Sequence, residues 1–185
     1  MASHRERLEA FARSLSEEEQ ERRVPNSDWR VKDFLIHLLT FDPEMVRWLE
    51  QVRAGDTGAP ATTSDGEPYD IDAWNNAQVA ERRDWPLDRL LAEGTEGRKQ
   101  FEDALRTLED EHIDQVVDFP GDNKRDPAKV QFKLFLGGLG RHDPIHVADI
   151  IKALPERADD PEIKAWIDDG IVRWYQGAMS GPPRR

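Results

Sequence analysis

Residues 141–151 read RHDPIHVADII and place His142 and His146 four residues apart at the start of an apolar-periodic run. On an α-helix, residues at this spacing lie above one another on one face, so both rings can reach one metal ion. Pro144 lacks an N–H, which is harmless in a first helical turn and disruptive further in. The stretch therefore predicts a helix that begins near Arg141, or a kink there.

A third histidine lies far away in the sequence, inside the apolar helix predicted over residues 29–53. This segment has a wide apolar face suited to the centre of a bundle, and His37 lies within it. Side chains from facing helices converge in bundle cores, so His37 and the 142/146 pair can form one three-nitrogen site with an open side. Each histidine also has a structural interpretation: His37 as a core residue bonded to a carbonyl, and the pair as helix-start residues.

Several polar residues are candidates for the surroundings of this site. Asp42, Asp143 and Asp149 are near the histidines in sequence, and any of them can accept the far ring N–H of a ligand. Asn75 either donates into the mouth of the bundle or faces solvent. Arg141 either attracts an anionic substrate or forms a surface ion pair. His4 and His112 stand in polar surroundings and are predicted at the surface.

The remaining helices follow from apolar spacing and helix-breaking residues. Helical segments are predicted over 2–21, 29–53, 71–109 and 127–154. Pro43 can kink or restart the second segment, Pro86 opens the second part of the third, and glycines bend the fourth. Residues 54–70 are rich in glycine, proline and serine and predict a long crossover loop, and residues 113–117 form at most a hairpin.

The expected fold class is all-α, an antiparallel four-helix bundle with an additional C-terminal helix. The bundle is predicted over residues 1–155 and the added helix over 156–178, packed on the same domain. This last helix opens at Asp160 and Pro161 and carries Ile163, Trp166 and Trp174 on one side. Residues 179–185 are predicted to be a disordered tail.

Composition excludes several function classes. The 185-residue chain suits one domain, and 26 basic against 38 acidic residues give a net charge of −12, which disfavours binding to nucleic acid or anionic membranes. The chain has no cysteine, so any thiol in its chemistry must come from outside. It lacks a signal-like apolar core and any apolar run of about 20 residues, so a cytoplasmic protein is expected.

Three stretches together resemble one family. DWRVKDFLIHLL (28–39), DAWN (72–75) and HDPIHVADI (142–150) are similar to the DinB-like superfamily, which includes the mycothiol-dependent maleylpyruvate isomerases. The resemblance spans roughly residues 5–155 and implies a four-helix bundle, a three-histidine divalent-metal site and a homodimer. By this resemblance, the ligand positions fall on His37, His142 and His146. Pro144, between the paired ligands, departs from the family pattern.

The resemblance also implies chemistry on a small-molecule substrate. Members that it resembles use a metal-bound low-molecular-weight thiol as a nucleophile, which predicts a metal-dependent transferase or isomerase; the catalytic residues themselves are not assigned. Two alternatives stay open: a metal-dependent hydrolase, and a non-catalytic small-molecule-binding or stress protein with a structural metal. Three imidazoles suit zinc, nickel or iron, and also copper, so the residues do not identify the metal.

Overall fold

The computed structural model describes residues 2–55, 70–119 and 126–179. These residues are mostly helical, as the predicted all-α class requires, apart from one two-stranded hairpin. The predicted crossover loop over 54–70 and the predicted tail over 179–185 lie almost entirely outside the described residues. Within the described part, every helix is too short or too polar to cross a membrane.

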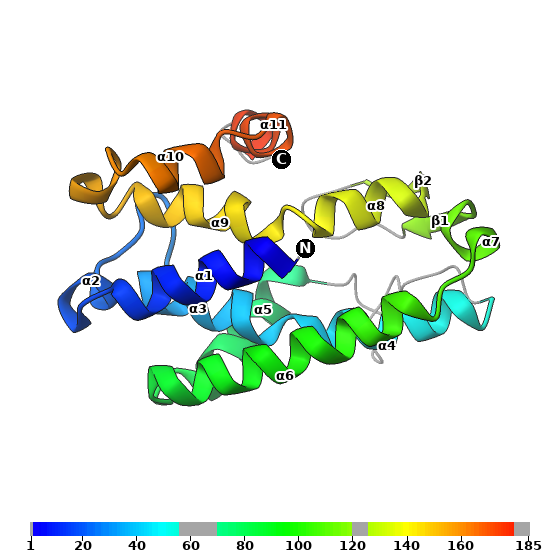
Figure 1. Cartoon of the computed structure of the whole chain (residues 1–185), viewed down its shortest axis with the longest axis horizontal. Coiled ribbons are helices and arrows are strands. Elements are labelled where there is room, and N and C mark those ends of the chain that lie inside the picture. The colour runs from blue at the N-terminus through cyan, green and yellow to red at the C-terminus, as the bar shows by residue number, and fades with distance from the viewer. Residues whose placement is uncertain (1, 56–69, 120–125, 180–185) are drawn as a thin grey trace.

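The elements follow one another in the order shown in Figure 1. The helices before the hairpin are α1 (Ala2–Ser14), α2 (Glu17–Glu21), α3 (Val31–Thr40), α4 (Asp42–Arg53), α5 (Ile71–Arg82), α6 (Leu87–Arg106) and α7 (Asp110–Ile113). The hairpin pairs β1 (Val116–Phe119) with β2 (Ala128–Gln131), antiparallel, with Val116 opposite Gln131. The elements after it are α8 (Phe132–Leu139), α9 (His142–Ile151), the 3-10 turn η1 (Pro155–Arg157), α10 (Pro161–Ile167) and α11 (Gly170–Met179).

Helix-capping residues divide two of the predicted segments. The helix predicted over 2–21 is two helices, because Ser16 starts α2 with a capping box: its hydroxyl accepts from the Glu19 N–H at 3.2 Å, and the Glu19 carboxylate accepts from the Ser16 N–H at 2.8 Å. The second segment restarts at Asp42, with Pro43 in the first turn of α4, as the proline predicted.

The C-terminal half also differs from the prediction. The break between α8 and α9 falls at Gly140 and Arg141, and not at Gly137 and Gly138. The single predicted C-terminal helix is two, because the Asp169 carboxylate accepts the Ile171 N–H at 2.7 Å and starts α11. This break turns Trp174 away from the core, and 69% of its surface is exposed.

Pairings between helices define their directions. Gly94 and Gly97 of α6 lie against Leu39 and Pro43, so residue numbers rise together and α6 runs parallel to α3 and α4. A Cβ on Gly94 would lie 2.8 Å from Leu39 Cδ2, so glycine permits this close approach. A strictly antiparallel bundle would reverse α6. Helix α5 stands between α4 and α6 in the chain, while α1 and the α8–α9 pair run opposite to α3, α4 and α6 (Figure 1).

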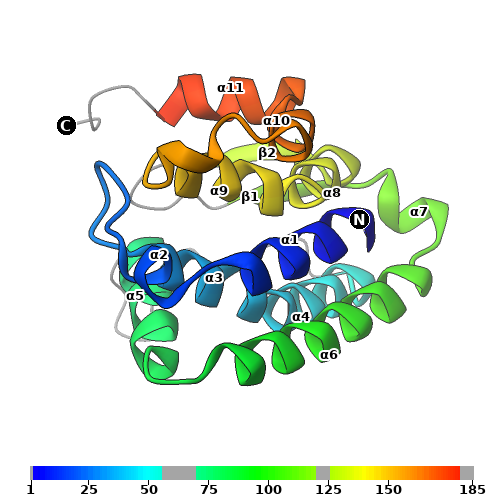
Figure 2. The same ribbon diagram turned by 60° about the vertical axis from the view of Figure 1, so that its left-hand side comes forward.

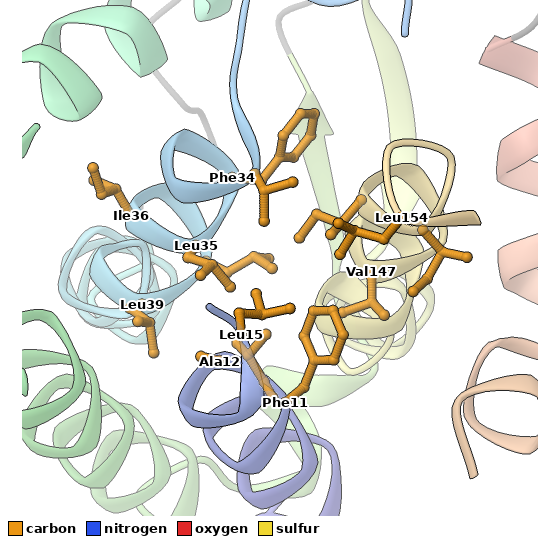
Figure 3. Close-up of a cluster of buried hydrophobic side chains, with 14 of the residues drawn as sticks. Phe11, Ala12, Leu15, Phe34, Leu35, Ile36, Leu39, Val147 and Leu154 are labelled. Carbon is orange, nitrogen blue, oxygen red and sulfur yellow. The ribbon is translucent and has the colours of Figure 1, made fainter. Parts of the chain in front are cut away.

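The buried side chains form two hydrophobic clusters. The larger cluster joins α1, α3 and α9 through residues such as Phe11, Leu35 and Val147, which point toward one another in Figure 3. The smaller cluster joins α4, α6, β1 and α8 through Leu49, Val52, Phe101, Val117 and Phe132. Burial of this apolar surface provides the main driving force for helix packing.

Candidate metal centre

The three predicted histidines come from two helices that face each other. His37 lies on α3, whose side chains are buried from Asp33 through Leu39, and only 7% of its surface is exposed. His142 is the first residue of α9, and His146 follows one turn later. The bond from the Ile145 N–H to the Arg141 carbonyl, at 3.0 Å, starts this helix, so Pro144 lies in a first turn that does not need its N–H.

The three rings converge on one point. Nε2 of His37 and Nε2 of His142 lie 3.2 Å apart, and one nitrogen from each of the three rings lies within 4.8 Å of the others. The ring planes cross at 76° to 82°. Tetrahedral coordination at zinc–nitrogen distances of about 2.0–2.1 Å separates ligand nitrogens by about 3.3 Å. Small ring rotations would therefore let the cluster hold one divalent cation.

Aromatic side chains surround the cluster. Trp29 and Phe41 lie 5.4 and 5.5 Å from the His37 ring, and Phe41 lies 4.6 Å from the His142 ring. Burial lowers the pKa of His37 and of His142 well below the usual value, and the neighbouring His146 lowers both further. Both rings are consequently neutral near pH 7, which is the form that binds a metal ion.

Asp149 is the predicted carboxylate that contacts a histidine of the cluster. Its Oδ2 lies 3.2 Å from Nδ1 of His146, one helical turn before it. Burial alone would raise the pKa of Asp149, but hydrogen bonds from His146, Lys152 and Gln176 outweigh burial and hold the pKa at about 2. The ionised carboxylate accepts the Nδ1 proton and leaves Nε2 of His146 free to bind a cation.

Asp42 and Asp143 belong instead to a buried ionic cluster, which we define as Arg5, Asp42, Arg98 and Asp143. Arg5 Nη2 donates to Asp42 Oδ2 at 3.1 Å and lies 3.4 Å from Asp143 Oδ1. Arg98 Nε donates to the same Asp42 oxygen at 2.8 Å. All four residues are at most 9% exposed. Burial raises the pKa of Asp42, and both arginines oppose this effect. The cluster ties α1, α4, α6 and α9 together.

The ionic cluster occupies the transition between the two hydrophobic clusters. On α3 and α4 the larger cluster ends at Leu39 and the smaller begins near Met45, with Asp42 between them. Arg5 and Arg98 were not identified from the sequence. A signal for them exists, because each is in register with the apolar stripe of its own helix, where a charged residue requires a buried partner.

The other candidates lie at the edges of the cluster. Asn75 is on α5, and its Oδ1 is buried and accepts no hydrogen bond from a described residue. The next residue, Asn76, accepts a 2.6 Å bond from Trp29 Nε1, which joins α5 to the aromatic wall of the site. Arg141 forms an ion pair with Asp169 at 3.6 Å, which is the kind of contact that the ion-pair interpretation expects.

His4 is half-buried and not a plain surface residue. Its Nδ1 accepts a 2.9 Å hydrogen bond from Nε1 of Trp166 on α10. This bond fastens α10 to α1. His112 is also half-buried, and its Nδ1 accepts a 3.0 Å bond from the Glu109 N–H, where it caps α7.

Comparison with known protein families shows which family the chain belongs to. The sequence model of the mycothiol maleylpyruvate isomerase N-terminal domain matches residues 1–130. The chain belongs to this family. It is a DinB-like family, so the resemblance noted in the sequence is confirmed. None of the curated proteins compared with the chain matches it.

The residues matched by the family model include only one histidine of the cluster. The match contains His37 and Asn75 but ends before His142 and His146. The contribution of α9 to the cluster therefore depends on the geometry of this chain. Gln176 and Tyr175 of α11, which also lie beyond residue 130, were missed in the sequence. Their positions near His146 depend on a helix break that apolar spacing does not reveal.

Proposed function

We propose that the chain binds one divalent metal ion through His37, His142 and His146 and is a metal-dependent transferase or isomerase that uses a low-molecular-weight thiol. The observation that carries this proposal is the convergence of three ring nitrogens from α3 and α9. Family membership supports it, since the family is named for mycothiol and maleylpyruvate. Zinc, nickel and iron are all compatible with three imidazole ligands.

The number of ligands favours an enzyme over a structural metal site. Among residues 2–55, 70–119 and 126–179, the group that could hold an ion contains three histidines and no fourth ligand. Structural zinc sites are closed by four protein ligands, whereas catalytic sites leave a position for water or substrate. His142 and His146 are partly exposed, so they lie at the edge of the core and are not sealed within it. The absence of cysteine agrees with an external thiol.

The residues of the chain have separate roles in this proposal. The three histidines hold the ion, Asp149 orients His146, and Trp29, Phe34 and Phe41 exclude water from the inner side of the rings. The bound ion would supply stabilisation of an anionic ligand, which lowers the pKa of a thiol or of water. A small-molecule substrate is expected.

Elemental analysis of the purified full-length chain tests metal binding. One equivalent of a divalent metal is expected in the wild type, with loss of most of it in His146→Ala. His112→Ala is the matched control, because His112 caps α7 on another part of the chain, and this variant should keep its metal. Equal metal content in all three proteins, or none in any, would contradict the proposal.

Assays with and without added thiol then separate the chemistries. Mycothiol and maleylpyruvate are the first compounds to test, as the family name suggests. Turnover that requires both metal and thiol supports the proposal. Metal-dependent turnover without thiol would instead indicate a hydrolase, and stoichiometric binding without turnover would indicate a binding or stress protein.

Three further features are proposed with the function. We propose that α1, α3–α4, α6 and α8–α9 form one four-helix bundle domain within residues 1–155, with the segment 156–178 packed on it. A cytoplasmic homodimer is also proposed, from the family resemblance. Light scattering after gel filtration would give twice the mass of 21.3 kDa for a dimer. A mass near that of one chain would contradict the dimer alone.

A further inference from the structure

Helix α11 is attached to α9 on both sides of the histidine pair. Figures 1 and 2 both show α11 on the outer side of α9, and the two helices are in contact. At the start of α11, Asp169 pairs with Arg141, the residue before His142. Further along, Gln176 bonds to Ile145 and Asp149, which flank His146. The C-terminal segment, outside the family match, therefore contacts the helix that carries two of the three rings.

One amide group forms the inner attachment. Nε2 of Gln176 donates to the Ile145 backbone carbonyl at 3.2 Å and to Asp149 Oδ1 at 3.0 Å. An amide nitrogen has two hydrogens, so it can make both bonds at once. Because the carbonyl belongs to the backbone of α9, the first bond fixes the amide, and the fixed amide then holds the carboxylate.

The carboxylate of Asp149 in turn contacts His146. One oxygen, Oδ1, accepts from Gln176, and the other, Oδ2, lies 3.2 Å from Nδ1 of His146. Lys152 donates to Oδ1 at 2.8 Å and also to Oε1 of Gln176, so its ammonium group links the two side chains, but the lysine side chain is long and about half exposed. A flexible lysine fixes the plane of a carboxylate less well than an amide held by a backbone carbonyl.

We infer that Gln176 is a positioning residue for the metal centre: it holds Asp149 so that the carboxylate fixes the His146 ring with Nε2 turned toward the ion. This inference rests on the proposed function, because the orientation of His146 affects affinity only if His146 binds the metal. Helix α11 thus contributes to metal affinity without supplying a ligand. Partners that contact a ligand directly, as Asp149 contacts His146, typically change metal affinity 10- to 100-fold, and Gln176, which acts through Asp149, is expected at the lower end of this range.

Metal affinity of the full-length chain tests the inference. Zinc dissociation constants would be measured by competition with a chromophoric chelator for the wild type, Gln176→Leu and Gln176→Glu. Leucine lacks both donors, and glutamate keeps the length but presents an acceptor to Asp149. Each variant should bind zinc about 10-fold more weakly. Trp174→Ser is the matched control on the same helix, because Trp174 is 69% exposed, and it should bind within about twofold of the wild type.

A double-mutant cycle shows whether Gln176 acts through Asp149. In the Asp149→Asn background, Gln176→Leu should weaken zinc binding by less than about twofold, because the carboxylate that it positions is gone. A merely structural role for α11 predicts that the two effects multiply. Thermal unfolding of the metal-free variants identifies any variant that does not fold, and Gln176→Glu then replaces Gln176→Leu in the cycle.

The outcomes of this test distinguish the two proposals. Zinc binding by the wild type, its loss in His146→Ala and unchanged binding in both Gln176 variants would overturn the role of Gln176 and leave the metal centre intact. Fully multiplicative effects of Gln176→Leu and Asp149→Asn would overturn it as well. Equal zinc binding by the wild type and His146→Ala would overturn the proposed function and, with it, this inference.

Discussion

Asp143 and Asp149 lie on the same helix, each close to one histidine of the cluster, but their surroundings differ. Asp143 follows His142 and is buried at 3% exposure among Arg5 and Arg98. Asp149 lies one turn after His146, is partly exposed, and is held by Lys152 and by Gln176 of α11. The inner carboxylate thus belongs to the core, whereas the outer one belongs to the edge of the site. We expect the inner one to determine stability and the outer one to determine metal affinity.

The largest effect is expected from removing the inner carboxylate. Asp143→Ala leaves two buried arginines with Asp42 as their shared partner, and breaking a buried ion pair costs about 3–5 kcal/mol of unfolding free energy. Asp149→Ala, on the same helix, should cost about 1 kcal/mol, as is usual for partly exposed ion pairs. Urea denaturation of both metal-free variants measures the difference, and equal losses would remove the distinction between the two aspartates.

As the pH falls, protonation of the buried His37 and His142 should destabilise the fold before protonation of Asp149 does. In the unfolded chain a histidine has a pKa near 6.5. The pKa values of His37 and His142 are lower in the folded protein, so below about pH 6.5 the unfolded state binds more protons and folding stability falls. Two such histidines give a slope of up to about 2.7 kcal/mol per pH unit, and His142→Gln should halve it.

The outer carboxylate should respond at lower pH. The pKa of Asp149 is about 2 in the folded protein, below its usual value, so its contribution is present above about pH 4 and is lost as the pH falls toward 2. Urea denaturation of the metal-free chain from pH 7 to pH 5 separates the two ranges. A free energy of unfolding that stays constant over this interval would contradict the lowered pKa values of His37 and His142.

A smaller loss of stability is expected from a change at the close contact between α6 and α3 in the core. A Cβ on Gly94 would meet the Leu39 carbonyl oxygen at 3.0 Å as well as Cδ2 of that leucine, so Gly94→Ala should push α6 outward and cost about 1–3 kcal/mol. Gly137→Ala on α8 is the matched control, because nothing lies within 4 Å of its Cβ. That variant should be stabilised by about 0.5–1 kcal/mol. Thermal unfolding compares the two, and a stable Gly94→Ala would contradict the close approach.

The smallest effect on stability is expected from Asp149→Asn, which keeps the shape of the side chain. An asparagine cannot supply the negative charge that orients His146, so zinc affinity should fall about 10- to 100-fold while the metal-free protein unfolds within about 0.5 kcal/mol of the wild type. Calorimetric titration and urea denaturation give the two values. A large loss of stability with unchanged affinity would reverse the roles of the inner and outer carboxylates.

The sequence predicted the helical class and the His142–His146 pair because both depend on local spacing, whereas His37 was assigned from the expected convergence of bundle helices and from the family resemblance. Apolar residues recur at helical intervals, and His142 and His146 share a face whatever the tertiary structure. The direction of α6 and the two-part C-terminal segment were not predicted. They depend on tertiary packing at Gly94 and on capping by Asp169, which compete with apolar periodicity.

The polar partners were predicted only in part for a similar reason. Asp149 lies one turn from His146, so its contact follows from helix geometry. Arg5, Arg98 and Gln176 reach the site from three other helices, and their partners are distant in the sequence. Charged residues within an apolar stripe are a usable signal for the two arginines. An exposed-looking glutamine near the end of a chain carries no such signal.

The most direct test of the account is X-ray absorption spectroscopy of the full-length chain loaded with one equivalent of zinc. Three imidazole nitrogens are expected at about 2.0–2.1 Å from the zinc ion, with the remaining ligand exchangeable. In His37→Ala, one imidazole should be lost from the spectrum, which would show that α3 and α9 bind the same ion. A zinc spectrum with one imidazole or none, or one that does not change in His37→Ala, would contradict the central claim.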